Sequence, residues 1–209
     1  MNHAYTIQNV KGQADDALDN IDFALFDEHT VKRLLVEQPD LMPYYPQKRA
    51  INRGIDLAYG KRQITSVVTS GILQGQSINQ MARHLMDRVT GMNQTSAIRA
   101  ARTAVTQAEN AGRQAAADEL ESKGAILQKR WVATLDNRTR HGHAEAHGQM
   151  VDNDKPCTVG GEELMFPGDG SMGASGWNIY NCRCARVTEI VGFRSMLTEE
   201  QRKRANIRA

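Results

Sequence analysis

Apolar residues recur every three or four positions through the first two thirds of the chain, which is the spacing of a buried helix face. Over residues 47–75 this pattern predicts one long helix, although glycines interrupt it. Between Ser77 and Val89 the same spacing returns, and Ser77 with Gln80 forms the residue pattern of a capping box, which marks a helix start. The pattern therefore indicates successive amphipathic helices.

A third helix is predicted from about Ser96 to Ser122, where Gly124 provides a suitable end. One face of this helix carries small side chains only, which lets a neighbouring helix approach closely. The stripe consists of Ala97, Ala101, Ala104, Ala108, Ala111 and Ala115. We therefore expect residues 21–124 to form a helical region.

Before these helices, residues 1–20 have few bulky apolar side chains and are expected to form a flexible arm. A helix beginning after Asp27 has to stop near Gln38, because three prolines follow and make residues 38–46 a stiff connector. At the other end, residues 194–209 are rich in arginine and lysine and are expected to form a basic tail.

The pattern changes at Ala125, where β-branched and aromatic residues look strand-like and glycine, proline, asparagine and aspartate become frequent. The strand-like apolar residues are Ile126, Leu127, Trp131, Val132 and Leu135. We therefore predict an α+β chain, in which the helical N-terminal region is followed by a small mixed α/β domain over residues 125–193.

Composition and charge limit the classes of protein to which this chain can belong. The 209 residues carry a formal net charge of only +2, so any nucleic-acid contact has to be local. It would use the basic tail or the arginines of the long helix, Arg99, Arg102 and Arg113. No run approaches the roughly 20 apolar residues of a membrane span, and the first ten residues do not have the pattern of a signal peptide. The three cysteines all fall after residue 150, which does not read as a disulfide framework and suits a reducing cytoplasm.

Two polar clusters in the C-terminal part carry the candidate chemistry. Arg140, His143 and His147 are spaced by three and four, so a helix over Arg138–Gly148 would present them on one face. A glycine-rich loop, Gly168–Gly176, precedes the block Asn-Cys-Arg-Cys at 181–184. We assign no catalytic residue and expect a structural polar cluster made of Asp136, Arg138, Arg140, His143, Asn181 and Arg183.

The histidines and cysteines allow two interpretations. His143, His147, Cys182 and Cys184 together offer two nitrogen and two sulfur ligands, a set that a structural zinc accepts. Alternatively, His143 joins Arg140 and Asp136 in a buried hydrogen-bonded network, and the cysteines pack as small apolar side chains. We favour the hydrogen-bonded network, with no cofactor, over the zinc site.

An ordered series of residues resembles the phage Mu F-like head morphogenesis family over about residues 77–190. The series is Arg102-Thr103, Asn110, Trp131, Thr134, Asp136, Arg138-Thr139-Arg140, His143, Gly148, Pro167 and Asn181-Cys182-Arg183-Cys184. The resemblance implies a minor capsid protein of a tailed double-stranded DNA phage or prophage, acting in procapsid assembly. It also implies partners among the portal and other head proteins, and a place in the virion after assembly in the host cytoplasm.

Two enzymatic alternatives remain open. A suspected fold relationship links the family to ADP-ribosyltransferases, whose chemistry needs an arginine, a Ser-Thr-Ser-like strand and a catalytic glutamate. Here Arg138 or Arg140 could supply the arginine, but Glu162-Glu163 lacks the expected Glu-x-Glu spacing. A nuclease would use His143, His147 and Arg140 for acid–base work and phosphate binding. Neither set is complete, so we expect a structural protein and not an enzyme.

Overall fold

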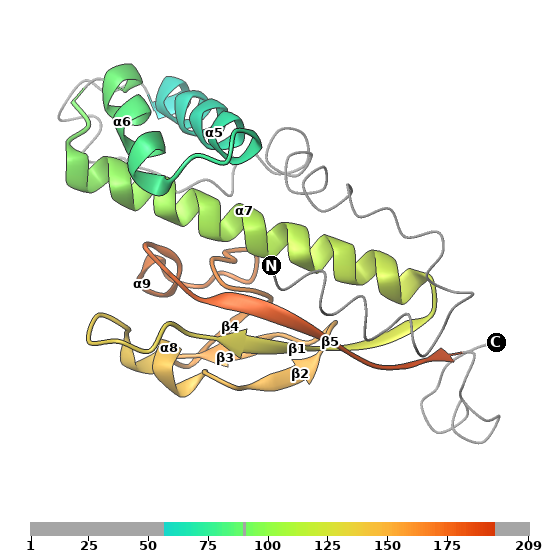
Figure 1. Cartoon of the computed structure of the whole chain (residues 1–209). Helices are drawn as coiled ribbons and strands as arrows, with labels where there is room; N and C mark the ends of the chain where they lie inside the picture. Colours follow the sequence, from blue (N-terminus) through green and yellow to red (C-terminus); the bar gives the residue numbers. More distant parts are fainter. Residues whose placement is uncertain (1–56, 90, 195–209) are drawn as a thin grey trace.

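The computed structural model describes residues 57–89 and 91–194 (Figure 1). Within these residues helices come first and a small antiparallel sheet follows, so the predicted α+β class is confirmed. The arm expected at 1–20, the connector at 38–46 and the basic tail beyond Arg194 lie outside the described residues. The division into domains at residue 124 stays a prediction.

Three long helices are described, and two of them, α6 and α7, begin directly after a capping residue. Helix α5 spans Leu57–Leu73, α6 spans Ile78–Arg88 and α7 spans Gln94–Ser122. The capping box of α6 is confirmed, because Ser77 and Gln80 exchange backbone and side-chain hydrogen bonds. Helix α7 starts two residues earlier than predicted, since the side chain of Asn93 accepts the amide N–H of Ser96 at 2.9 Å.

A helical core forms where α5 and α6 pack against the N-terminal half of α7. The alanine stripe is the part of α7 that faces this core, and the larger apolar side chains come from α5 and α6. Its buried members are Ile64, Val67, Val68, Met81, Ala82, Leu85, Val89, Ala97, Ala101, Ala104 and Ala108. Ala115 is only partly buried, so the stripe leaves this core before its predicted end.

The main sheet has the strand order β2-β1-β5 and is antiparallel throughout. Its strands are β1 at Ala125–Val132, β2 at Met150–Asp152 and β5 at Ala185–Phe193. Burial alternates along β1, as expected for a strand with one face covered. The prediction that Leu135 belongs to this strand is wrong: β1 ends at Val132, and Leu135 is 62% exposed.

Short elements complete the C-terminal part: α8 at His141–Glu145, β3 at Cys157–Val159, β4 at Glu162–Leu164 and α9 at Gly176–Ile179. Strands β3 and β4 form a separate two-stranded hairpin. A second core lies among these elements and β1. Its buried members are Trp131, Ala133, Ala146, Cys157, Val159, Leu164, Cys182 and Cys184.

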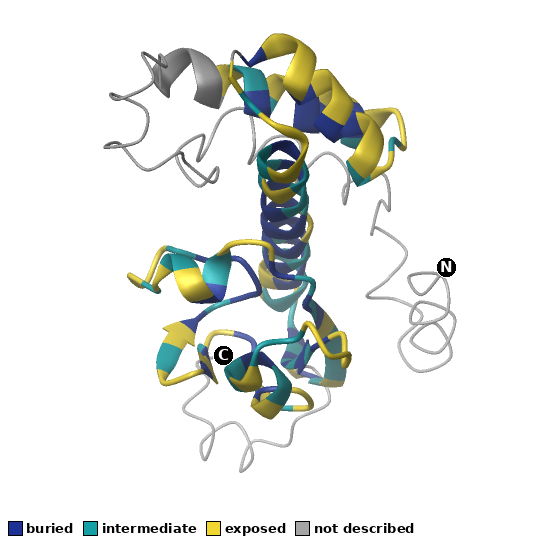
Figure 2. Ribbon diagram, turned by 90° about the vertical axis from the view of Figure 1, so that its left-hand side faces the viewer, coloured by how far each residue is buried: buried dark blue, intermediate teal, exposed yellow. Residues whose placement is uncertain are grey.

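Helix α7 is common to both parts of the fold. Figure 2 shows it nearly end-on, with α5 and α6 on one side and the strands on the other. Its C-terminal half contacts β1 and β5, where Ala117 and Leu127 share a third small core. Among the described helices, none combines the length and hydrophobicity needed to cross a bilayer.

Candidate functional site

The segment that leads into β5 is held to α7 by side chains that bond its backbone. The hydroxyl of Thr106 donates to the carbonyl of Cys182 at 2.9 Å, and the amide of Asn110 donates to the carbonyl of Cys184 at 3.3 Å. The Asn110 side-chain oxygen in turn accepts the backbone N–H of Arg186 at 2.8 Å. Both α7 side chains are buried, so they satisfy backbone groups that water cannot reach.

Asn181 begins this segment in a left-handed backbone conformation, with φ of 56°. Asparagine tolerates this region better than most residues. Its backbone N–H donates to the hydroxyl of Thr103 at 2.8 Å, and its side-chain oxygen accepts from the Arg102 guanidinium at 2.7 Å. Asn181 therefore fixes both the turn and the position of Arg102.

Asp136 and Arg183 form a two-pronged ion pair, with both nitrogen–oxygen distances at 2.6 Å. The Asp136 carboxylate also accepts the backbone N–H of Arg138 at 2.9 Å. The hydrogen bonds from Arg183 and from this N–H hold the pKa of Asp136 far below its usual range. The loop before α8 is thereby fastened to the Asn-Cys-Arg-Cys block.

His143, Cys182 and Cys184 meet in a buried centre beneath the loop. Nδ1 of His143 lies 3.3 Å from Sγ of Cys184 and 3.6 Å from Sγ of Cys182. The three side chains are at most 5% exposed, and their ligand atoms all lie within 4.8 Å of one another. Such a group could hold a metal ion.

The two thiols of this centre differ in acidity. A hydrogen bond from the Cys184 thiol, followed by one from His143, lowers the pKa of Cys182 despite its burial. The same bond raises the pKa of Cys184, because its proton is engaged with the neighbouring sulfur. The two cysteines therefore titrate as a coupled pair, and the thiolate is the form that binds metals.

Arg140 closes one side of the centre. Its guanidinium donates to the carbonyl of Tyr180, lies 3.4 Å from Nε2 of His143 and stacks over the ring of Trp177 at 5.4 Å from its centroid. Trp177 itself is 71% exposed. The cation thus connects the buried histidine with an aromatic ring on the surface.

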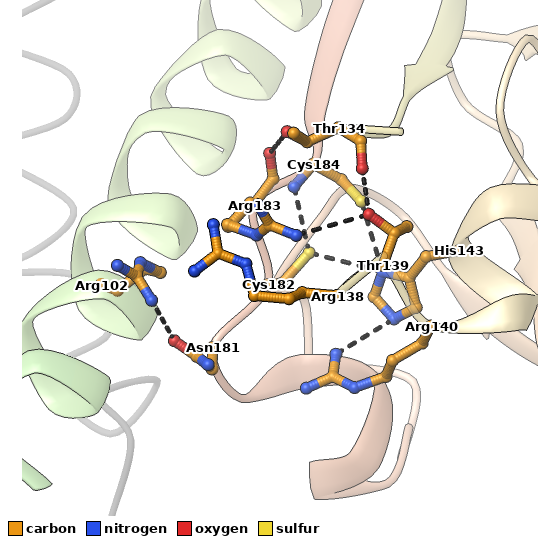
Figure 3. A pocket seen from close by; sticks show the side chains of 10 residues that line it. All are labelled: Arg102, Thr134, Arg138, Thr139, Arg140, His143, Asn181, Cys182, Arg183 and Cys184. Atoms are coloured by element: carbon orange, nitrogen blue, oxygen red, sulfur yellow. Dashed lines mark hydrogen bonds between the residues drawn. The ribbon is translucent and has the colours of Figure 1, made fainter. Parts of the chain in front are cut away.

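An open pocket of about 90 Å³ lies over these groups. Figure 3 shows the side chains that line it, which come from α7, from the loop and start of α8, and from the segment before β5. Four of the lining residues are arginines and none is acidic: Arg102, Arg138, Arg140 and Arg183. The pocket is therefore strongly basic.

The structure places the predicted polar residues around this pocket, apart from Asp136, which does not line it and pairs with Arg183. The predicted helix over Arg138–Gly148 is shorter, because α8 spans only His141–Glu145. Of the four candidate metal ligands, three come together. His147 is directed elsewhere, since its Nδ1 accepts the backbone N–H of Ala133 at 3.1 Å.

Sequence reasoning missed a second buried polar group between α7 and the sheet. Lys129 and Arg186 are 1% and 2% exposed, and both contact Oε1 of Gln114, at 3.5 and 2.8 Å. Arg186 also donates to Oδ1 of Asn153 at 2.7 Å. A signal was available, because Lys129 stands at an inward position of the alternating strand, with the apolar residues Leu127 and Trp131 at the inward positions on either side.

Comparison with known proteins agrees with the resemblance found in the sequence. The sequence model of the family described as "Phage Mu protein F like protein" matches residues 62–187. This match covers more than half of the chain and includes α6, α7, β1 and the whole pocket. No solved structure gives a significant match.

Two curated proteins are similar to the chain. One is the NAD(+)--arginine ADP-ribosyltransferase EFV of Enterococcus faecalis, 27% identical over 139 residues, which are 66% of this chain and 28% of that protein. Another is the minor head protein GP7 of Bacillus phage SPP1, 31% identical over 130 residues, or 62% of this chain and 41% of that protein. The chain thus spans less than half the length of either relative.

Proposed function

We propose that this chain, which belongs to the phage Mu protein F-like family, is a minor head protein of a tailed double-stranded DNA phage or prophage. The observation that carries the proposal is the family match over residues 62–187, joined by the similarity to a phage protein named as a minor head protein. The matched region contains α7 and all the residues that line the basic pocket.

In finer terms, we propose that the protein acts in procapsid assembly near the portal and then stays in the virion, in the head interior or at the portal. Its partners are the portal protein and other head proteins. Packaged DNA is a further partner through the basic C-terminal tail, whose arginines and lysines suit phosphate contacts. These roles require binding surfaces and no chemical step.

Induction of the phage or prophage with and without this gene tests the proposal. With the gene, purified heads are expected to contain a few copies of the chain by quantitative mass spectrometry, and the chain should co-purify with the portal protein from co-expressing cells. Without the gene, head yield or infectivity should fall. Heads that lack the chain in the wild type, or assemble and infect equally well without it, would contradict the proposal.

We also propose that His143, Cys182 and Cys184 supply three ligands of a zinc ion, with a water molecule and not His147 in the fourth position. Zinc with ligand distances of about 2.3 Å to sulfur and 2.0–2.1 Å to nitrogen, in tetrahedral geometry, places those ligand atoms roughly 3.6 Å apart. The 3.3 and 3.6 Å separations at Nδ1 of His143 are close to that spacing. A zinc on Nδ1 leaves Nε2 protonated, so Arg140 would no longer donate to the ring.

Metal content of the purified, untagged chain tests the zinc proposal, together with its thermal melting with and without a strong chelator. We expect about one zinc per chain and a lower melting temperature with chelator. Cys182→Ser should lose the metal, whereas His147→Ala should keep it, because His147 is no ligand. A wild type that contains no metal and melts at the same temperature with and without chelator would contradict the zinc proposal. The hydrogen-bonded network would then be the correct interpretation.

We propose no ADP-ribosyltransferase activity for this chain, although one similar protein bears that name. That protein is matched over only 28% of its length. Glu162, one of the two adjacent glutamates that lack the Glu-x-Glu spacing, accepts hydrogen bonds from the Ser175 backbone at 2.9 Å and from Asn178 at 2.8 Å. These bonds give it a bracing role between β4 and α9. Purified chain incubated with labelled NAD and an arginine-containing acceptor should transfer no label.

A further inference from the structure

The pocket gathers more positive charge than its surroundings neutralise. Within the described residues, its four arginines have one carboxylate close by, that of Asp136, which pairs with Arg183 and lies 3.7 Å from Arg138. Arg102 bonds the neutral side chain of Asn181. Arg140 bonds a carbonyl and stacks on a ring.

The arginines act on one another across this space. Burial lowers the pKa of Arg102, and the positive charges of Arg183 and Arg138 lower it further. Gathering like charges in a partly enclosed pocket costs free energy unless an anion is bound there. The Asp136 pair and the Asn181 contact nevertheless hold two of the guanidinium groups in fixed positions, which is the preorganisation that a binding site needs.

We propose that this pocket binds a phosphate group of a nucleic-acid backbone. Guanidinium groups match phosphate oxygens in both charge and geometry. The pocket volume of about 90 Å³ suits one phosphate group and is well below the roughly 300–1,000 Å³ of pockets that enclose drug-sized molecules. It is also open to the surface, so a phosphate that remains part of a chain can enter.

The rim of the pocket favours a nucleic acid as the source of the phosphate. Trp177 is 71% exposed and lies beside Arg140, so it offers an aromatic face next to the cations. Arg138 has 77% of its side chain exposed and can reach a second phosphate or the same one from outside. This contact is separate from the basic tail and does not depend on the proposed role in the head.

Binding of a fluorescent single-stranded DNA, whose unpaired bases can reach Trp177, tests the site. It is followed by anisotropy with the full chain between about 50 and 200 mM salt. Arg138→Gln and Arg102→Gln are each expected to weaken binding roughly 3- to 10-fold and to reduce the salt slope by about one. Arg83→Gln on α6 removes the same charge from an exposed position outside the pocket and should change Kd less than about 2-fold. Arg138 is largely exposed, so its loss should leave the melting curve unchanged.

Three outcomes would overturn the proposal. Pocket variants that bind DNA as tightly as the wild type would place the contact on the tail or another surface. If inorganic phosphate binds the pocket in calorimetry and DNA does not bind, the pocket is a site for a free anion. A glutamate-rich peptide that binds more tightly than DNA and loses affinity in Arg138→Gln would assign it to an acidic protein segment.

Discussion

Asn181 shows how one residue serves both the backbone and the pocket. Its φ of 56° needs a residue that accepts the left-handed conformation, while its side chain fixes Arg102. Asparagine meets both needs, since glycine has no side-chain acceptor and alanine has neither the acceptor nor the freedom. The first residue of the Asn-Cys-Arg-Cys block is therefore specified by geometry as well as by chemistry.

Replacing Asn181 with alanine and with glycine separates these two roles. Asn181→Gly should cost only the lost hydrogen bond, about 0.5–1.5 kcal/mol of unfolding free energy. Asn181→Ala should cost roughly 1 kcal/mol more, because alanine disfavours the left-handed region. Urea unfolding of both variants measures the difference. Equal stabilities would show that the backbone conformation is not what selects asparagine.

Asp136 gives the protein a predictable response to acid. Its pKa is depressed in the folded state by Arg183 and the Arg138 N–H, so its stabilising effect is complete above the unfolded value of about 3.9 and is lost as pH falls toward the lower folded value. Asp136→Asn should melt a few degrees lower at neutral pH. The gap in melting temperature should close as the pH is lowered below about 4. A gap that stays constant down to the lowest pH would contradict the ion pair.

At the scale of elements, close approach of two backbones holds α8 against the β3–β4 hairpin. A Cβ atom added at Gly142 would lie 2.6 Å from the Cα of Gly160. Backbone atoms cannot rotate away as a side chain can, so the two segments would have to separate. The position of His143 in the buried centre depends on this contact, because it is the next residue of the same short helix.

Gly142→Ala is accordingly expected to lower the unfolding free energy by about 1–3 kcal/mol. Gly192→Ala is a matched control in β5, since its added Cβ would meet nothing closer than the Cδ1 of Ile126 at 3.9 Å. That control should stay within about 0.5 kcal/mol of the wild type. Thermal melting of the two variants measures the difference in stability. Equal losses of stability in both variants would refute the backbone contact.

Several elements followed directly from local sequence signals. The capping box at Ser77 and the alternation along Ala125–Val132 act within a few residues, so the helix start and the strand could be predicted. The length of α8 could not, because spacing alone cannot show that a helix ends at Glu145. The same spacing groups His147 with His143, whereas in the structure His147 accepts a hydrogen bond from the backbone N–H of Ala133.

The buried contacts between α7 and the sheet depend on tertiary structure that the sequence does not display. Arg186 reaches Asn153, and the Asn153 amide donates to Asp118 at 2.9 Å and to Glu121 at 2.8 Å on α7. An amide side chain thus connects a buried cation to carboxylates nearer the surface. Nothing in the local pattern pairs residues 33 positions apart. Such pairings become visible only once the helix and strands are placed.

At the scale of the whole molecule, α7 belongs to two packed regions at once. Its alanine face closes the helical core with α5 and α6, and its polar side chains hold the segment from Cys182 to Arg186. Because α7 contacts both regions, the unfolding of either region removes contacts that hold α7 in place for the other. The described residues should therefore unfold as one cooperative unit.

Leu85→Ala tests this cooperativity. Leu85 is fully buried in the helical core, so the substitution should cost about 2–5 kcal/mol. In a Trp177→Phe background, fluorescence reports on Trp131, which is 1% exposed in the second core, while far-ultraviolet circular dichroism reports mainly on the helices. Both signals should shift together to lower temperature. Leu73→Ala, at a 63% exposed position of α5, should shift neither. If only the dichroism transition moved, the two regions would be independent, and α7 would be a tether between them in place of a common core element.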